Sequence, residues 1–315
     1  MSTNGRLTQP RAGRQSSEHD ALAAPLFNPR ALMQGLMERH GIHLVEIERA
    51  QCMVRDHPVE STRRTTIILR RGSPEQNRNW FAGAGASGPV VIVGMEPWTE
   101  VLLDFDRAAD MFIEHLKLPE RKTEVCLTGG SGGSFAAMML AAHLAERLPG
   151  ITVKVVAFSL VAELYHKDET GEHYWPHMIV GLRDRPDTMA GMRRYACVRP
   201  HFERAMAAPG SDLRVKAFTT PLSTLDWHQA ELIADLACVR TEEVETDDYN
   251  HDMMAWTSMP SRDTELSRQK LFQWMKIRNP NWPQRTLETR TDRELAVALE
   301  WRQRYPDLAS LFTGF

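Results

Sequence analysis

A short apolar strand that leads into a glycine-rich corner, and then into an apolar helix, most constrains how this chain can fold. The corner has the pattern Gly129-x-Ser131-x-Gly133, with apolar runs over residues 125–128 and 135–138 on either side. Side chains two residues before and after a serine at a sharp turn would collide with the opposing backbone, and glycine removes that collision. The pattern therefore predicts a tight strand-to-helix turn with a strained serine at its apex.

A serine in this place is a candidate nucleophile. The G-x-S-x-G pattern is that of a nucleophile elbow, in which the serine hydroxyl is presented at the end of a strand. The backbone N–H of the next residue, Gly132, then points into the site and can stabilise an oxyanion. The hydroxyl is reactive only when a base can reach it. The structural alternative is that Ser131 caps the helix that begins near Gly132.

The same glycine-rich loop has a second functional interpretation. Residues 128–133 are similar to the dinucleotide loop of short-chain dehydrogenases, which also requires a glycine where Phe135 stands. That loop follows the first strand of its domain, whereas more than a hundred residues precede this one. Tyr165 and Lys167 are two residues apart, so they do not form the Tyr-x-x-x-Lys pair of that family. A nucleotide-binding oxidoreductase is therefore the less favoured alternative.

The composition limits the kinds of molecule that this chain is expected to bind. The 315 residues, 42% of them hydrophobic and 25% charged, suffice for one large α/β domain or two small ones. A net charge of −3 offers no electrostatic basis for binding nucleic acid, and no apolar run is long enough for a membrane span. The four cysteines and twelve histidines are scattered without metal-ligand spacing. We therefore expect no metal, no cofactor, no nucleic acid and no membrane span.

The beginning of the chain differs from the rest. Residues 1–27 are rich in Ser, Arg, Gln and Ala and lack an apolar segment, which predicts a disordered tail. No secretory apolar region is present, so we expect a cytoplasmic protein, with export by a different N-terminal signal as the alternative. We expect the main domain over residues 28–277 and a C-terminal helical extension over residues 278–315.

Apolar periodicity beyond the tail predicts strands that alternate with helices. Strands are expected near residues 43–54, 64–69, 90–93, 125–128, 153–158, 213–218 and 242–245. Helices are expected near residues 28–40, 99–118, 134–147, 229–236, 263–276 and 292–304. This order predicts an α/β fold, with a mostly parallel sheet and helices on both faces. Residues 159–212 are too many for a simple crossover and contain a helix-like stretch at 187–206. They are predicted to form an inserted helical cap, and the alternative is an extended crossover helix with surface loops.

Two later residues are candidate partners of Ser131. Asp226 lies in a predicted loop after the strand at 213–218, and His251 follows the strand at 242–245. Both loops are expected at the carboxyl edge of the sheet, where ligand crevices form. His251 would take the Ser131 proton, and Asp226 would orient the imidazole and stabilise its charged form. Other residues could take these roles: His228 is the competing base, and the competing acids are Asp235, Glu245, Asp247 and Asp248. The structural alternatives are that Asp226 caps a helix near Trp227 and that His251 is an ordinary loop residue.

The order of elements, the Gly129-x-Ser131-x-Gly133 pattern and the placement of Asp226 and His251 resemble the α/β-hydrolase superfamily over roughly residues 60–277. The resemblance implies an esterase-like or acyl-transfer site for a small-molecule acyl substrate, usually without metal or organic cofactor. Gly130 departs from the family, in which a bulkier residue often precedes the nucleophile.

A second departure concerns the oxyanion site. The family commonly has a His-Gly stretch after its third strand, and Arg70-Arg71-Gly72-Ser73 stands there in this chain. If this is the oxyanion loop, the backbone N–H groups of Ser73 and Gly132 both donate to the oxyanion. The glycine-rich stretch Gly83–Gly88 is the alternative loop for this role. The resulting hypothesis is a serine hydrolase that cleaves an ester, thioester or related acyl bond. The alternatives are a serine acyltransferase, a non-catalytic scaffold of the same fold, and the oxidoreductase described above.

Overall fold

The computed structural model describes residues 41–48, 50–71, 88–95, 104–164, 194–220, 223–244 and 264–315. The predicted tail and the predicted helix at 28–40 lie outside these residues, as do Ser73, His251 and the stretch 165–193 of the predicted cap.

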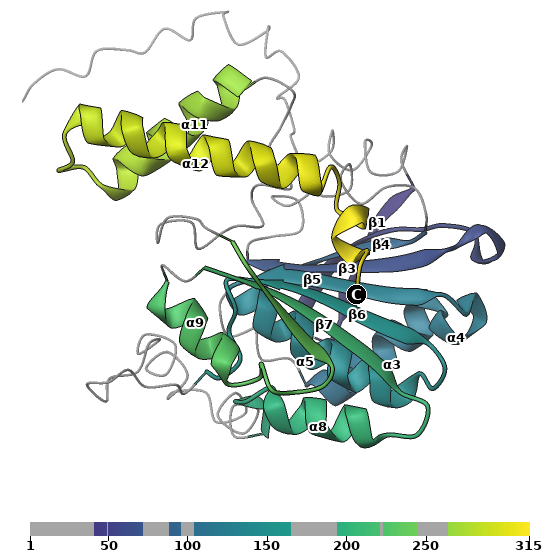
Figure 1. The fold of residues 1–315 in the computed structure, drawn as a ribbon. Helices are drawn as coiled ribbons and strands as arrows, with labels where there is room; N and C mark the ends of the chain where they lie inside the picture. The colour runs from purple at the N-terminus through teal and green to yellow at the C-terminus, as the bar shows by residue number, and fades with distance from the viewer. Residues whose placement is uncertain are drawn as a thin grey trace, which may run out of the picture. The chain divides into compact units, whose positions relative to one another are not determined.

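A mostly parallel sheet forms the centre of the fold, as the sequence predicts. Among the described residues it has eight strands in the order β1-β2-β4-β3-β5-β6-β7-β8 (Figure 1). The strands from β3 to β8 pair in parallel, and β1 and β2 add an antiparallel edge next to β4. Their bounds are β1 Ile42–Ile47, β2 Ala50–Arg55, β3 Arg64–Arg71, β4 Val90–Met95, β5 Glu124–Gly130, β6 Thr152–Phe158, β7 Asp212–Thr219 and β8 Val239–Glu243.

Two strand predictions need correction. The single strand expected at 43–54 is a hairpin of β1 and β2, because Glu48 has a left-handed backbone (φ 56°) that reverses the chain. The strand expected at 242–245 is β8, which begins three residues earlier at Val239. β8 pairs only with β7 in the described sheet and is mostly polar, so its sequence lacks the apolar signal of a buried strand.

Helices flank this sheet on both faces, as the sequence predicts. Two of them begin at a side-chain cap. Asp104 accepts the N–H of Arg107 at 3.3 Å and precedes α3; Ser223 precedes α9, which begins five residues before the predicted position. The helices are α3 Phe105–Leu116, α4 Leu118–Arg121, α5 Gly132–Arg147, α8 Arg199–Ala207, α9 Thr224–Glu231, α11 Thr264–Arg278 and α12 Gln284–Arg304, with 3-10 turns η2 Val59–Ser61 and η4 Ala309–Phe312.

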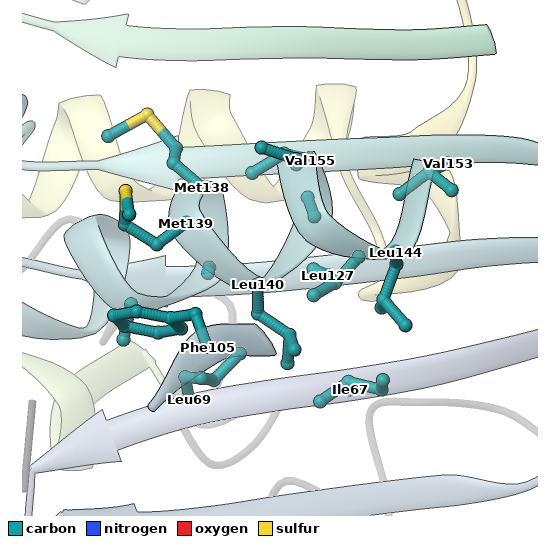
Figure 2. Close-up of a cluster of buried hydrophobic side chains, with 14 of the residues drawn as sticks. Ile67, Leu69, Phe105, Leu127, Met138, Met139, Leu140, Leu144, Val153 and Val155 are labelled. Carbon is teal, nitrogen blue, oxygen red and sulfur yellow. The ribbon is translucent and has the colours of Figure 1, made fainter. Parts of the chain in front are cut away.

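Helix α5 is buried on all sides, from Gly132 to Ala145. A helix that is apolar all round must be covered all round, and α3 and α8 lie beside α5 on the same face of the sheet (Figure 1). Figure 2 shows side chains of α5 packed with side chains of β3, β5 and β6 and with Phe105 of α3; the labelled residues are Ile67, Leu69, Phe105, Leu127, Met138, Met139, Leu140, Leu144, Val153 and Val155.

Helix α8 falls within the segment predicted as a cap, yet it packs on the sheet face beside α5. Its Phe202 and Ala205 are buried in the same core as α5. α8 connects the parallel neighbours β6 and β7, which is the place of an ordinary crossover helix. The C-terminal part of the predicted cap is thus a layer of the domain.

The C-terminal segment covers the other face of the sheet. Trp301 and Tyr305, at the end of α12, stack edge-on against Phe218 of β7, with ring centroids 4.7 and 5.7 Å away. Lys216 of β7 is buried on the same face and donates its Nζ to the carbonyl oxygen of Thr313 at 2.8 Å. The residues predicted as a C-terminal extension therefore contribute to the core.

One buried polar cluster joins the three helices on the α5 face. His143 of α5 is fully buried, with Nδ1 2.8 Å from Oδ1 of Asp106 in α3 and Nε2 3.1 Å from Nδ1 of His201 in α8. Burial alone would raise the pKa of Asp106, but a hydrogen bond from Arg147 and the charges of His143 and Arg194 hold that pKa well below its usual range. Desolvation lowers the pKa of His143 to about 4, against the opposing attraction of Asp106.

Both shifts predict that acid destabilises the fold. The unfolded chain takes up a proton on each of these groups at a higher pH than the folded protein does, so folding stability falls as the pH falls. For His143 the loss begins near its ordinary pKa of about 6.5 and is complete below about 4. The melting temperature should decline over this range, and His143→Asn, which keeps a donor for Asp106, should flatten the decline.

The control for this experiment is His115→Asn, at an exposed position of α3. It should leave the pH dependence of the melting temperature as in the wild type. An undiminished decline in the His143→Asn variant would contradict the assignment of this pH dependence to the buried cluster.

Candidate active site

Ser131 lies at the corner between the last residue of β5 and the first residue of α5. Its backbone angles are φ 54° and ψ −127°. A side chain at positive φ is strained, and such strain persists only where the surrounding structure enforces it. The strained turn that the sequence predicts is therefore present, while the role of Ser131 stays a prediction.

The glycine two residues before Ser131 is required by a close backbone contact. A Cβ atom on Gly129 would lie 2.1 Å from the carbonyl oxygen of Gly133 and 2.8 Å from the backbone nitrogen of Ser134. Both distances are far below van der Waals contact, so no other residue fits at this position without moving the backbone. The first turn of α5 thus rests directly on the end of β5.

Hydrogen bonds hold the corner in its strained form. Ser131 donates its N–H to the carbonyl oxygen of Phe158, the last residue of β6, at 3.1 Å. The carbonyl oxygen of Ser131 accepts both the N–H of Ser134 at 2.8 Å and its hydroxyl at 2.6 Å. The backbone groups of Ser131 are thus used on both sides, while its side chain takes no part in these bonds.

The side chain of Ser131 does not cap the helix that follows it. It makes no capping hydrogen bond to the first turn of α5, so the structural alternative of a helix cap is wrong. Ser131 is half-buried, whereas Gly132, Gly133 and Ser134 after it are fully covered. The N–H of Gly132 belongs to the first turn of the helix, whose amides have no partner within the helix and carry its positive dipole end.

Asp226 lies in the first turn of α9, and the prediction that it lies in a loop is wrong. Ser223 caps this helix: its Oγ accepts the N–H of Asp226 at 3.3 Å. The pattern Ser223-x-x-Asp226 is a capping-box signature, and this signal in the sequence was missed. Because Ser223 is the cap, the alternative in which Asp226 caps the helix near Trp227 is also wrong. The carboxyl group of Asp226 is fully buried.

Ser131 and α9 belong to the same edge of the sheet. Ser131 follows β5 and α9 follows β7, with β6 between them. Two strand spacings amount to about 10 Å, a separation that leaves room for a third side chain between Ser131 and Asp226. His251 is the candidate for that position; it and Ser73 lie outside the described residues, so their places stay predictions.

The described competitors are engaged elsewhere. Nδ1 of His228 lies 3.6 Å from a carboxylate oxygen of Glu231 along the same helix. Asp235 is bonded to the guanidinium of Arg199. Glu245, Asp247 and Asp248 lie outside the described residues.

Two polar residues of this region were not singled out in the sequence. Ser159 follows β6 directly, has a positive φ of 47°, and is fully buried; its hydroxyl has no hydrogen-bond partner among the described residues. Gln229 of α9 is also fully buried, and its Oε1 accepts the backbone N–H groups of Ala162 and Glu163 at 2.7 and 2.8 Å. Neither position has a sequence signal, because a single serine or glutamine in a polar stretch is common.

Within the described ranges, no group of three or more His, Cys, Asp or Glu residues is arranged to hold a metal ion. No described helix combines the length and the apolar character that crossing a bilayer requires.

Comparison with solved structures shows similarity in the arrangement of strands and helices. A carboxyl esterase from the fungus Tuber melanosporum shares 12% identity, with 65% of this chain and 76% of that chain covered and a TM-score of 0.45. A hyperthermophilic esterase from Pyrobaculum calidifontis shares 16% identity, with 82% and 90% covered and a TM-score of 0.44. No protein-family model matches the sequence, and no curated protein sequence matches it. By its own strand order and strand-to-helix corner, the fold is α/β-hydrolase-like.

The contact at Gly129 predicts that this corner tolerates no side chain. Gly129→Ala should lower the free energy of unfolding by about 3 kcal/mol or more, because the new methyl group would overlap backbone atoms. Gly150→Ala is the control: Gly150 has a positive φ of 79° but open space around it, so that change should cost about 1 kcal/mol. Urea unfolding of both variants measures the difference, and equal losses would contradict the contact.

Proposed function

We propose that this protein is a serine hydrolase that cleaves an ester, thioester or related acyl bond of a small molecule, with Ser131 as the nucleophile. The observation that carries the proposal is the strained backbone of Ser131 at the β5–α5 corner. The backbone conformation of Ser131 costs of order 1–3 kcal/mol. Its half-exposed side chain makes no capping hydrogen bond, so capping of α5 does not explain why a serine is held there.

In the proposed reaction, Oγ of Ser131 attacks the acyl carbon while His251 takes the hydroxyl proton. The oxygen of the tetrahedral intermediate accepts the N–H of Gly132, with the N–H of Ser73 as the second proposed donor. His251 passes its proton to the leaving alcohol or thiol, which leaves an ester on Ser131. A water molecule then gives a proton to His251 and attacks this ester to form a second tetrahedral intermediate. His251 returns that proton to Oγ of Ser131 as the ester bond breaks, which releases the acid and the free serine.

Asp226 is proposed to orient His251. The position of Asp226 supports this role. Its carboxyl group is fully buried in the first turn of α9, the helix that follows β7, at the same edge of the sheet as Ser131. A carboxylate held there can accept one ring N–H of the histidine, which leaves the other nitrogen unprotonated and facing the serine. It also stabilises the positive charge that the imidazole carries in each step.

Covalent labelling with a fluorophosphonate probe tests the proposal, since the probe reacts with activated serines. Wild-type protein should be labelled at Ser131, and Ser131→Ala should abolish labelling. His251→Ala should slow labelling by at least about a thousandfold, and Asp226→Asn by roughly a hundredfold to ten-thousandfold, because the base is then lost or wrongly oriented.

Ser61→Ala serves as the matched control, since Ser61 is exposed in the 3-10 turn η2. It should be labelled at the wild-type rate. Circular dichroism of each variant shows whether the fold is retained. A well-folded wild type that takes no label, or a Ser131→Ala variant that still does, would contradict the assignment; hydrolysis of p-nitrophenyl esters and acyl thioesters then distinguishes the substrate classes.

A further inference from the structure

The short segment that follows β6, residues 159–164, lies between the two parts of the proposed site. On one side it is bonded to the β5–α5 corner. Ser134 uses its Oγ twice: it donates to the carbonyl oxygen of Ser131 at 2.6 Å and accepts the N–H of Val161 at 3.1 Å. This hydroxyl therefore links the strained serine to the segment after β6.

On its other side the same segment is bonded to α9. Oε1 of Gln229 accepts the N–H of Ala162 at 2.7 Å and that of Glu163 at 2.8 Å. Gln229 is fully buried; its bond to Ala162 is shielded from water, and its bond to Glu163 is partly so. Gln229 follows Asp226 by three residues, which places the two side chains on the same side of the helix.

We propose that Gln229 is a positioning residue: it fixes α9, and with it Asp226, in a defined place relative to Ser131 through residues 159–164. The inference rests on the proposed function, in which Asp226 orients the base. Four hydrogen bonds, Ser131–Ser134, Ser134–Val161 and the pair accepted by Gln229, make a continuous connection between elements about 100 residues apart in sequence.

The chemistry of the side chain explains why a glutamine suits this position. A single amide oxygen has two lone pairs, and here each receives one backbone N–H. Without the acceptor, the buried N–H of Ala162 and the part-buried N–H of Glu163 would lose their partner, and the segment and α9 would separate or shift. A shift of about 1 Å in a catalytic group is enough to reduce a rate by roughly a hundredfold.

The test compares Gln229→Met with Gln229→Glu. Methionine keeps the length and shape of the side chain but removes the oxygen, so the fluorophosphonate labelling rate and kcat for a p-nitrophenyl ester should fall by roughly tenfold to a hundredfold while KM changes little. Glutamate keeps acceptor oxygens for both N–H groups but adds a charge on the side of α9 that carries Asp226, so its rate should lie between those of Gln229→Met and the wild type; a rate no higher than that of Gln229→Met would contradict the role of the acceptor.

Ala230→Gly provides the matched control on the same helix. Ala230 is buried in the core and makes no side-chain hydrogen bond, so glycine weakens α9 without touching the Gln229 contacts. Its labelling rate should stay within about threefold of the wild type at a temperature where both variants are folded. A loss in Ala230→Gly as large as that in Gln229→Met would overturn the inference.

A double-mutant cycle separates positioning from general weakening. If Gln229 acts through Asp226, then adding Gln229→Met to the Asp226→Asn variant should lower the labelling rate further by less than about threefold. If the fold-losses of the two single variants multiply in full in the double variant, the inference is overturned while Ser131 remains the nucleophile. Labelling that survives Ser131→Ala would instead overturn the proposed function, and with it the role of Gln229, so the two failures are distinguishable.

Discussion

The end of β5 and the first turn of α5 lie so close together that no side chain fits between Gly129 and Gly133. This contact has two consequences. It turns the chain within a single residue, Ser131, whose backbone must take up a positive φ. It also presses the whole of α5 onto the centre of the sheet, where the helix must be apolar on every side. The strained serine and the most buried helix thus have one origin.

Because α5 is enclosed, its one buried imidazole determines how the neighbouring helices are joined. His143 cannot reach water, so its ring nitrogens face Asp106 of α3 and His201 of α8. Burying such groups is costly unless each has a partner, and the network provides partners from all three helices. This polar layer lies on the α5 face of the sheet, whereas the strained Ser131 lies at the carboxyl edge of the sheet. The pH dependence of stability and the strain at the corner therefore have separate structural sources.

Much of the fold could be predicted because its signals are local. Continuous apolar runs marked the central strands, and glycine spacing marked the β5–α5 corner, since both depend on neighbouring residues. The edge strand β8 was misplaced because a strand with one partner can be polar. The loop predicted around Asp226 is instead the first turn of α9, because Ser223 caps the helix three residues earlier. Ser131 and Asp226 could be named from the sequence, whereas nothing local indicated Ser159 or Gln229.

The sequence by itself determined the alternation of strands and helices and the strained turn at Ser131, because periodicity and steric exclusion act within a few residues. Only the tertiary structure decided that α8 packs beside α5, that Trp301 and Tyr305 close the second face of the sheet, and that Gln229 bonds the segment after β6. These contacts join residues far apart in sequence, such as His143 and His201, 58 positions apart, and Phe218 and Trp301, 83 positions apart; their strength depends on burial and geometry that arise only once the sheet has formed.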